Sequence, residues 1–340
     1  MASQPKVCTN KDCNVAIDGK CVEGFALDQC PHMTQISVED LEEVNELDET
    51  PREVRVMSLS MGEPLNCSEA AALQCRRISR TVGIIGPNDA GKTSLVASVY
   101  DLLQDGPVAN VSFAGSSTLV GFEKVCHDAR VASRRDVPYT ERTTQGAEAT
   151  FFHLDLRQAE SDVVSLFIGD RSGEDYLAAT DDLARAEDFF ELRRADVVTL
   201  LVNGEHLAAS EHRHQVKAIT PQIVDALVEA RSLRRGVRLA VVLTKKDSVL
   251  ASTNSDRVQR DFDAMVDAIT FNHSDYLGAI ERFIVAASPK DSAKVKRGTG
   301  VDQLLLFWLC SSVPPVPIQP SISISSRMID HLGEYGEVVL

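Results

Sequence analysis

Residues 86–93 read G-P-N-D-A-G-K-T and match the pattern G-x-x-x-x-G-K-[ST], which constrains the fold of this chain more than any other feature. The β-branched run Thr81–Ile85 precedes this loop, and a helical pattern over Leu95–Leu103 follows it. Glycines let such a loop turn its N–H groups towards a phosphate, and the start of the next helix adds a positive dipole. We therefore expect Lys92 to contact the β- and γ-phosphates and to act in catalysis, and Thr93 to hold Mg²⁺. The other expected nucleotide contacts are Gly86, Asn88, Asp89, Ala90, Gly91 and Ser94.

From residue 80 onward, short apolar runs alternate with helical patterns. The strand-like runs are Ala149–Leu156, Val163–Ile168, Asp196–Val202, Leu239–Thr244 and Phe283–Ala287. The helical patterns are Leu183–Arg194, Gln215–Arg231, Asp256–Ile269 and Val301–Leu309, and a capped helix is expected from Ser68. This alternation predicts an α/β fold of the P-loop NTPase type, with a mostly parallel sheet and helices on both faces.

A second motif, D-x-x-G, occupies Asp170–Gly173 at the end of an apolar strand, where open α/β sheets place ligands. Asp170 would hold Mg²⁺ through water, and the N–H group of Gly173 would contact the γ-phosphate. Glu174 stands where many GTPases carry a glutamine that orients the attacking water, so it is a candidate catalytic residue. The alternative is a surface glutamate at a helix start. Arg171 is a candidate internal stabiliser of phosphate charge.

A third motif, T-K-x-D, follows the run Leu239–Leu243 and ends at Asp247. A carboxylate there can accept hydrogen bonds from both N1–H and the 2-amino group of guanine, whereas adenine offers no such pair of donors. Thr244 begins the motif, and Lys245 would lay its stem against the base. The backbone at Ser288, after the next apolar run, is the expected contact for the guanine O6 atom. The order and spacing of the three motifs predict GTP rather than ATP as the ligand.

The amino-terminal residues differ from the rest of the chain. The net charge is −15, and the first 50 residues hold 11 acidic and 3 basic side chains. This acidity argues against nucleic acid or an anionic membrane as the main partner. No apolar run reaches the ~20 residues of a membrane-spanning helix, and the first 20 residues lack the apolar core of a secretion signal, so we expect a cytoplasmic protein without a transmembrane segment.

Cysteines are concentrated in the same amino-terminal stretch, with the spacing Cys8-x₄-Cys13-x₇-Cys21-x₈-Cys30-x-His32. These five side chains offer enough ligands for a four-coordinate structural Zn²⁺ site, with His32 as the alternate ligand. Reduced cysteines, redox chemistry and an iron–sulfur site are the alternatives. The expected organisation is a Cys-rich module over 1–35, an acidic linker over 36–54, a GTPase domain over 55–312 with an insertion at about 104–140, and a Pro/Ser-rich tail over 313–340.

The three motifs in this order resemble the translation-factor-related class of P-loop GTPases. The stretches Phe113–Glu123 and Val137–Thr144 narrow the resemblance to the bacterial double-GTPase family, whose members are predicted components of conflict (anti-invader) systems. The segment C-V-E-G-F…C-P-H is similar to modules attached to such proteins. The resemblance implies that Thr143, or else Thr144, closes over Mg²⁺ and the γ-phosphate and takes part in catalysis. Arg142 either reaches the phosphates or is a surface arginine.

These features together predict a Mg²⁺-dependent GTPase that acts as a molecular switch. Slow intrinsic hydrolysis is expected, because no glutamine follows Gly173. The chain holds one set of GTPase motifs, so a companion GTPase or effector would be another protein chain, and an oligomer is possible. One alternative is a zinc-containing scaffold in which the nucleotide is mainly structural. Another is a GTP-dependent metallochaperone that uses the cysteines.

Overall fold

The structure is a computed structural model that describes residues 6–8, 21, 24–26, 29–35, 61–134, 148–158, 162–290 and 294–310, with the backbone alone at 128–134. The chain divides into two compact units, Met1–Leu59 and Ser60–Leu340. The predicted acidic linker at 36–54 and the predicted tail at 313–340 lie outside the described residues.

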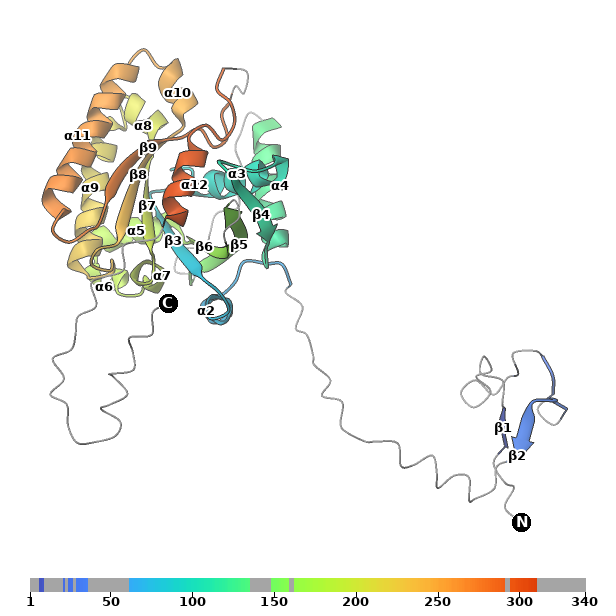
Figure 1. Ribbon diagram of the computed structural model, residues 1–340. Coiled ribbons are helices and arrows are strands. Elements are labelled where there is room, and N and C mark those ends of the chain that lie inside the picture. Colours follow the sequence, from blue (N-terminus) through green and yellow to red (C-terminus); the bar gives the residue numbers. More distant parts are fainter. Residues whose placement is uncertain are drawn as a thin grey trace, which may run out of the picture. The chain divides into compact units, whose positions relative to one another are not determined.

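The larger unit is built on a seven-stranded sheet with the order β4-β5-β6-β3-β7-β8-β9 (Figure 1). The strands are β3 (Ser79–Ile85), β4 (Val111–Gly115), β5 (Thr150–Gln158), β6 (Val163–Asp170), β7 (Val197–Asn203), β8 (Arg238–Thr244) and β9 (Ile280–Ile284). Five neighbouring strands, from β6 to β9, run parallel. The predicted α/β architecture with a mostly parallel sheet is confirmed.

The helices cover both faces of the sheet (Figure 1). They are α2 (Cys67–Gln74), α3 (Lys92–Asp105), α4 (Leu119–Arg134), α5 (Gly173–Asp181), α6 (Leu183–Ala186), α7 (Phe190–Arg193), α8 (Gly204–Ala208), α9 (Arg213–Glu229), α10 (Lys246–Ala251), α11 (Ser255–His273) and α12 (Val301–Leu309). One core joins α3, α4 and α12 to the sheet, and the other joins α5 to α11. In β8, Ala240 and Val242 belong to the first core while Val241 and Leu243 belong to the second, as alternation along a strand requires.

The strands β4 and β5 form an antiparallel edge that the sequence pattern did not reveal in full. Strand β4 has only one buried residue, Val111, so it carries no strong alternation. It begins after a tight turn in which Ala109 and Asn110 both have positive φ. Together with α4, which packs against α3, β4 makes up most of the described part of the segment that we predicted to be an insertion at about 104–140.

The predicted helix over Leu183–Arg194 is wrong, because the chain forms the two short helices α6 and α7 instead. The break occurs at Phe189, whose φ of −85° and ψ of 63° are not helical. This bend seats α7 over two glycines that pair in register on neighbouring strands, Gly83 and Gly169. A Cβ atom on Gly83 would lie 2.4 Å from the Leu192 side chain, so the glycine lets α7 approach the sheet closely.

The predicted strand Phe283–Ala287 is shifted, since β9 ends at Ile284. Residues 285–287 are buried, and Val285 still donates its N–H group to Leu243 of β8, but the pairing with β8 ends there. The N–H group of Ala286 instead donates to the carbonyl of Thr299, in the segment before α12. The predicted strand was placed too far along the chain because residues 285–287 are apolar and buried without being part of β9.

Among the described residues of the smaller unit, β1 (Lys6–Cys8) and β2 (Met33–Gln35) pair in antiparallel fashion. Cys8 pairs in register with Met33, and the N–H group of Met33 donates to the carbonyl of Cys30. Two of the predicted zinc ligands, Cys8 and Cys30, therefore belong to the same small hairpin-like element. Cys13 lies outside the described residues.

Candidate nucleotide-binding site

The phosphate loop lies between β3 and α3, at the carboxyl edge of the parallel strands. Its conformation depends on glycine at two positions. Gly86 has a φ of +154°, and a Cβ atom there would lie 3.1 Å from Leu201. Gly91 has a φ of +94° and is the residue before the first turn of α3, so the free N–H groups of that turn face the loop.

Lys92 lies inside this loop, and its ammonium group donates to the carbonyl oxygens of Gly86 (3.0 Å) and Pro87 (3.2 Å). Burial lowers the pKa of Lys92, and the nearby Asp170 carboxylate acts in the opposite direction. The next residue, Thr93, is half-buried on the first turn of α3. Lys92 and Asp170 are thus close enough to influence each other, although Lys92 begins α3 and Asp170 ends β6.

The D-x-x-G loop, residues 170–173, lies directly against the phosphate loop. A Cβ atom on Gly173 would be 2.6 Å from the Lys92 ammonium nitrogen and 2.8 Å from the backbone nitrogen of Asn88. Only glycine fits so close to another main chain. The side-chain amide of Asn88 also donates to Glu174 Oε1 at 2.8 Å, and this bond joins the two loops.

Arg171 is held on the α5–α7 side of the D-x-x-G loop. Its guanidinium donates to both carboxylate oxygens of Glu191, at 2.7 and 3.1 Å, and lies 4.8 Å from the centre of the Phe189 ring. Both side chains of the pair are at least nine-tenths buried. Burial alone would lower the pKa of Arg171, but the Glu191 carboxylate raises it above its usual value. This arginine therefore anchors the loop to α7, and the contacts do not support a role as a stabiliser of phosphate charge.

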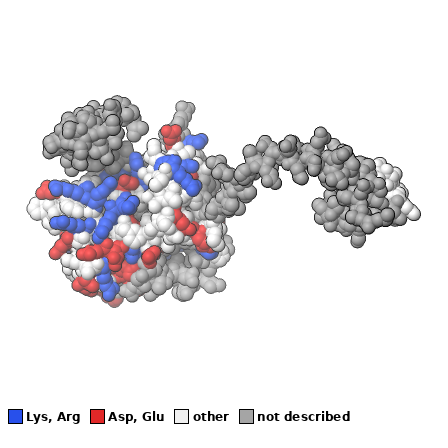
Figure 2. Space-filling model, turned by 90° about the horizontal axis from the view of Figure 1, so that it is seen from below, with Lys and Arg blue, Asp and Glu red and all other residues white. Residues whose placement is uncertain are grey.

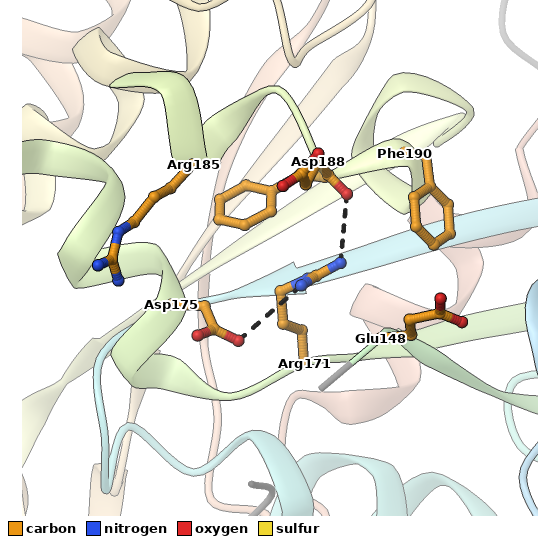
Figure 3. Close-up of a pocket in the computed structure, with 7 residues that line it drawn as sticks. Glu148, Arg171, Asp175, Arg185, Asp188 and Phe190 are labelled. Atoms are coloured by element: carbon orange, nitrogen blue, oxygen red, sulfur yellow. Dashed lines mark hydrogen bonds and ion pairs between the residues drawn. The ribbon is translucent and has the colours of Figure 1, made fainter. Parts of the chain in front are cut away.

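A pocket of about 380 Å³ lies around this anchor (Figure 3). Figure 3 shows the Arg171 guanidinium between Asp175 and Asp188. The labelled lining residues are Glu148, Arg171, Asp175, Arg185, Asp188 and Phe190. The pocket thus borders the D-x-x-G loop on the side of the helices.

The T-K-x-D loop reaches the phosphate loop from β8. The Thr244 hydroxyl hydrogen-bonds to the carbonyl of Ala90 at 2.9 Å and approaches the carbonyl of Val202 at 3.1 Å. Lys245 adopts the left-handed conformation, with a φ of 54°. Its ammonium binds Asp89 Oδ2 at 2.7 Å, which links the T-K-x-D loop to the phosphate loop.

Asp247 lies at the outer side of the same loop, in the first turn of α10. Its carboxylate accepts a hydrogen bond of 2.9 Å from the backbone N–H group of Lys290. Ser288 is exposed in the segment between β9 and Lys290. The structure therefore brings the segment after β9 next to Asp247, as the motif order led us to expect.

Three polar residues of this region escaped the sequence reasoning: Asn203, Glu205 and Lys290. The buried Asn203 amide donates to the carbonyl of Asp89 at 2.8 Å, while its oxygen caps α8. Glu205 accepts bonds from Lys245 (3.1 Å) and Lys290 (2.5 Å). A signal was available, because Asn203 is a polar residue at the carboxyl end of an otherwise apolar strand, followed by glycine.

Several predicted site residues lie outside the described residues, namely Thr143, Thr144, Arg142 and Cys13. In the part of the chain that the structure describes, no group of three or more His, Cys, Asp or Glu side chains is arranged to hold a metal ion. Within the same residues, no helix combines the length and the apolar character needed to cross a membrane.

Comparison with known proteins gave one family and a set of similar structures. One similar structure is the signal recognition particle receptor in the SRb-GTP/SRX complex from Chaetomium thermophilum, at 14% sequence identity and a TM-score of 0.38. That alignment covers 68% of this chain and 95% of the other. None of the curated proteins matched.

The family model described as Double-GTPase 2 matches residues 80–309, which is more than half of the 340 residues. The matched range contains the phosphate loop, the D-x-x-G loop and the T-K-x-D loop. It confirms the resemblance that the motifs indicated, and it leaves the Cys-rich amino-terminal residues outside. The chain belongs to the Double-GTPase 2 family.

Proposed function

We propose that the larger unit is a Mg²⁺-dependent GTPase that works as a molecular switch. The observation that carries this proposal is the meeting of three loops at one edge of the sheet. Lys92 and Gly173 lie together on one side of the phosphate loop, and Lys245 is bound to Asp89 on the other. In such a site the phosphates bind where the phosphate loop meets the D-x-x-G loop, and the base binds where it meets the T-K-x-D loop.

The residues at the phosphate side fit a Mg²⁺–nucleotide. The ammonium group of Lys92 is bound to main-chain carbonyls of the phosphate loop, where its positive charge can bind the β- and γ-phosphates. Thr93 and Asp170 supply the oxygen atoms that Mg²⁺ prefers, and Thr143 is our proposed third contact. When bound, Mg²⁺ would neutralise charge on the phosphate oxygens. The chain contributes position and electrostatic stabilisation.

The base side fits guanine. Asp247 has a carboxylate at the outer end of the T-K-x-D loop, and we propose that it accepts the two guanine donors. Asp89 and Glu205 bind the ammonium group of Lys245 and hold its side chain along the phosphate loop. In this orientation the aliphatic part of the side chain can cover the base. Ser288 lies near Asp247 through the bond from Lys290 and is the proposed neighbour of guanine O6.

Switching follows from the contact between the D-x-x-G loop and the phosphate loop. Gly173 is so close to Lys92 and Asn88 that a γ-phosphate has to separate them. Entry of GTP would break the bond between Asn88 and Glu174, whereas GDP leaves that space free. Once moved, Glu174 is the proposed group that orients the attacking water. Its negative charge next to phosphate is our reason to expect slow intrinsic hydrolysis.

The test is nucleotide affinity of the full chain, measured for GDP, GTP and ATP with Mg²⁺. We expect guanine nucleotides to bind and ATP to bind at least ~100-fold more weakly, because a site built on paired hydrogen bonds rejects a base that lacks the donors. Lys92→Ala should abolish binding of GDP and GTP, and Asp247→Asn should remove the preference for guanine. Equal affinity for ATP and GTP would contradict the assignment of Asp247, and unchanged affinity in Lys92→Ala would contradict the site itself.

We also propose that the switch acts on another protein chain, as an effector or a companion GTPase in a bacterial conflict system in the cytoplasm. The family and the single set of motifs support a separate partner. Copurification of neighbouring gene products with the GDP-bound and the GTP-analogue-bound chain tests this. Binding that does not depend on the nucleotide would favour the scaffold alternative, because a ligand without differential affinity shifts no equilibrium.

A structural Zn²⁺ in the smaller unit remains a proposal. Two observations support it: Cys8 and Cys30 lie at the strand pair β1–β2, and the Cys-rich segment over 1–35 is too short to fold stably without a metal or a disulfide. Metal analysis of the purified chain should give about one zinc per molecule. Loss of that zinc in Cys8→Ser, and its retention in Cys75→Ser, would assign the site; zinc that leaves during nucleotide cycling would favour the metallochaperone alternative.

A further inference from the structure

Arginines gather where the chain enters three neighbouring strands of the sheet. Arg76 and Arg77 precede β3 and Arg80 lies at its start; Arg193 and Arg194 precede β7; and Arg231, Arg234 and Arg235 precede β8. We call these eight residues the arginine edge. The three segments contain no lysine.

The sheet register brings these segments together. Strand β7 lies between β3 and β8, and Val197 pairs with both Val82 and Arg238. Asp196 connects all three entries, because it accepts the N–H group of Thr81 at 2.9 Å and lies 3.5 Å from the Arg234 guanidinium. Figure 2 views the larger unit from this end and shows Lys and Arg side chains gathered there, with acidic side chains beside them.

Most of the guanidinium donors of the arginine edge remain available. The side chains of Arg76, Arg193, Arg194 and Arg231 make no hydrogen bond or ion pair with any residue that the structure describes, and all four residues are exposed. Arg77 binds Asp155 at 3.2 Å and Arg235 binds the carbonyl of Asp275 at 3.4 Å, each through one nitrogen. The positive charge of this surface is thus only partly compensated.

The main chain beneath the arginine edge is fixed. The buried Arg238 donates to the carbonyls of Phe307 (2.8 Å) and Cys310 (2.7 Å) and lies 4.7 Å from the centre of the Phe307 ring. The Ile78 carbonyl accepts a hydrogen bond from Ser165 on β6. A surface whose backbone is already ordered loses little entropy on binding.

We propose that the arginine edge is a docking surface for a short acidic segment of a partner protein. A carboxylate matches the planar guanidinium fork in a bidentate manner, as Glu191 does with Arg171 inside this molecule. Ile78, 56% exposed between Arg77 and Arg80, offers a contact for an apolar side chain within such a segment.

The negative charge around the arginine edge favours a short acidic peptide over nucleic acid or an anionic membrane as its partner. Nucleic acid and anionic membranes extend far beyond an area of three strands and would meet the surrounding surface of the larger unit, and residues 51–340 carry a net charge of −7. A short acidic segment needs only the arginine edge itself. The edge also lies at the opposite end of the strands from the nucleotide loops, roughly 20 Å away for a strand of seven residues. Docking and nucleotide binding can therefore occur together, and the inference does not depend on the proposed GTPase activity.

The test is a fluorescence anisotropy titration of the full chain with a labelled peptide of about twelve residues, rich in Asp and Glu with one central Leu. A second peptide carries Asn and Gln in place of the acids. We expect the acidic peptide alone to bind, and Arg193→Ala/Arg194→Ala to weaken it by about tenfold. The matched control, Lys124→Ala/Arg260→Ala, removes two positive charges elsewhere and should bind as the native chain does.

Thermal unfolding checks that each variant is folded, and Arg234→Ala/Arg235→Ala replaces the first pair if that pair does not fold. Equal loss in the edge variant and in the control would overturn the proposal, because it would show a general charge effect. Absence of peptide binding would overturn it as well. So would tighter binding of single-stranded DNA, or of vesicles containing phosphatidylserine, when the edge variant loses that binding too.

Discussion

The two sides of the phosphate loop are held in different ways. On the base side, Thr244 and Asn203 join the phosphate loop to β8 and β7 through buried or half-buried hydrogen bonds, and Lys245, which Glu205 on α8 also binds, adds an exposed one to Asp89. On the γ-phosphate side, the D-x-x-G loop touches the phosphate loop at Gly173 and through one exposed bond from Asn88 to Glu174, while Arg171 ties it to α7. The proposed base side is therefore held by more hydrogen bonds than the proposed γ-phosphate side, and we expect the D-x-x-G loop to move about the Arg171–Glu191 anchor. Changes on the two sides should have different consequences.

The largest effect is expected from the anchor itself. Glu191→Gln leaves the buried Arg171 charge without its carboxylate, and breaking a buried pair in this way costs about 3–5 kcal/mol. Urea unfolding of the native chain and of the variant measures this loss. Glu187→Gln, an exposed glutamate near the end of α6, is the control and should change the unfolding free energy by less than about 0.5 kcal/mol. Equal stability of the two variants would show that Arg171 is not an anchor.

The next effect should appear in Gly173→Ala. The added methyl group would collide with the Lys92 ammonium and the Asn88 backbone, so the D-x-x-G loop cannot reach its place beside the phosphates. We expect single-turnover hydrolysis of GTP to fall by about 100-fold, or ~2.7 kcal/mol in the barrier, with GDP affinity changed by less than about threefold. In Gly115→Ala the new methyl group meets no atom closer than 3.6 Å, and its rate should be native. A large loss of GDP affinity in Gly173→Ala would contradict the proposed division, because it would show that the D-x-x-G loop is also needed to bind GDP.

The base side can be tested with Asn203→Ala, which removes the bond to the Asp89 carbonyl and the cap of α8. Leaving these groups without partners costs roughly 1–3 kcal/mol, so affinity for GDP and GTP should fall together by about tenfold. Stopped-flow release of a fluorescent nucleotide follows this as a faster dissociation rate. Asn254→Ala changes an asparagine that makes no side-chain cap on α11, and it should release nucleotide at the native rate. An effect on GTP alone would contradict the division into two sides.

The smallest effect concerns Glu205. Burial by itself would raise its pKa, but hydrogen bonds from Lys290 and Lys245 outweigh burial and lower the pKa below its usual value. The folded state then binds fewer protons than the unfolded state near the usual pKa of about 4.3, so this stabilisation is present above that range and is lost as the pH falls through the lowered value. Glu205→Gln should cost less than about 1 kcal/mol at pH 7, because the side chain is 38% exposed. Thermal melts across pH should show this difference shrinking in acid; a difference that grows there would contradict the ion pairs.

The fold and the loops were predictable where local chemistry decides the structure. The turn of the phosphate loop depends on Gly86 and Gly91, and strands such as β7 and β8 are buried throughout and mostly apolar, so both stand out in a single sequence. Strand β4 and the break at Phe189 were not predictable, because both depend on packing between segments distant in sequence. Asn203 stands out in the sequence as a polar residue at the end of a mostly apolar strand, but its role follows from its bond to Asp89 in the phosphate loop, which the sequence does not show.

The glycine pair Gly83 and Gly169 has a consequence for sequence variation. Neither residue lies within a nucleotide motif, yet α7 packs on both, and Gly83 leaves the room for Leu192 that keeps Glu191 beside Arg171. We expect a relative with a larger residue at position 83 to keep every motif and its affinity for nucleotide, while α7 and the Arg171 anchor of the D-x-x-G loop are displaced. Members of one family can therefore differ in how the D-x-x-G loop moves because of a residue within the sheet, such as Gly83, that a comparison of motifs does not include.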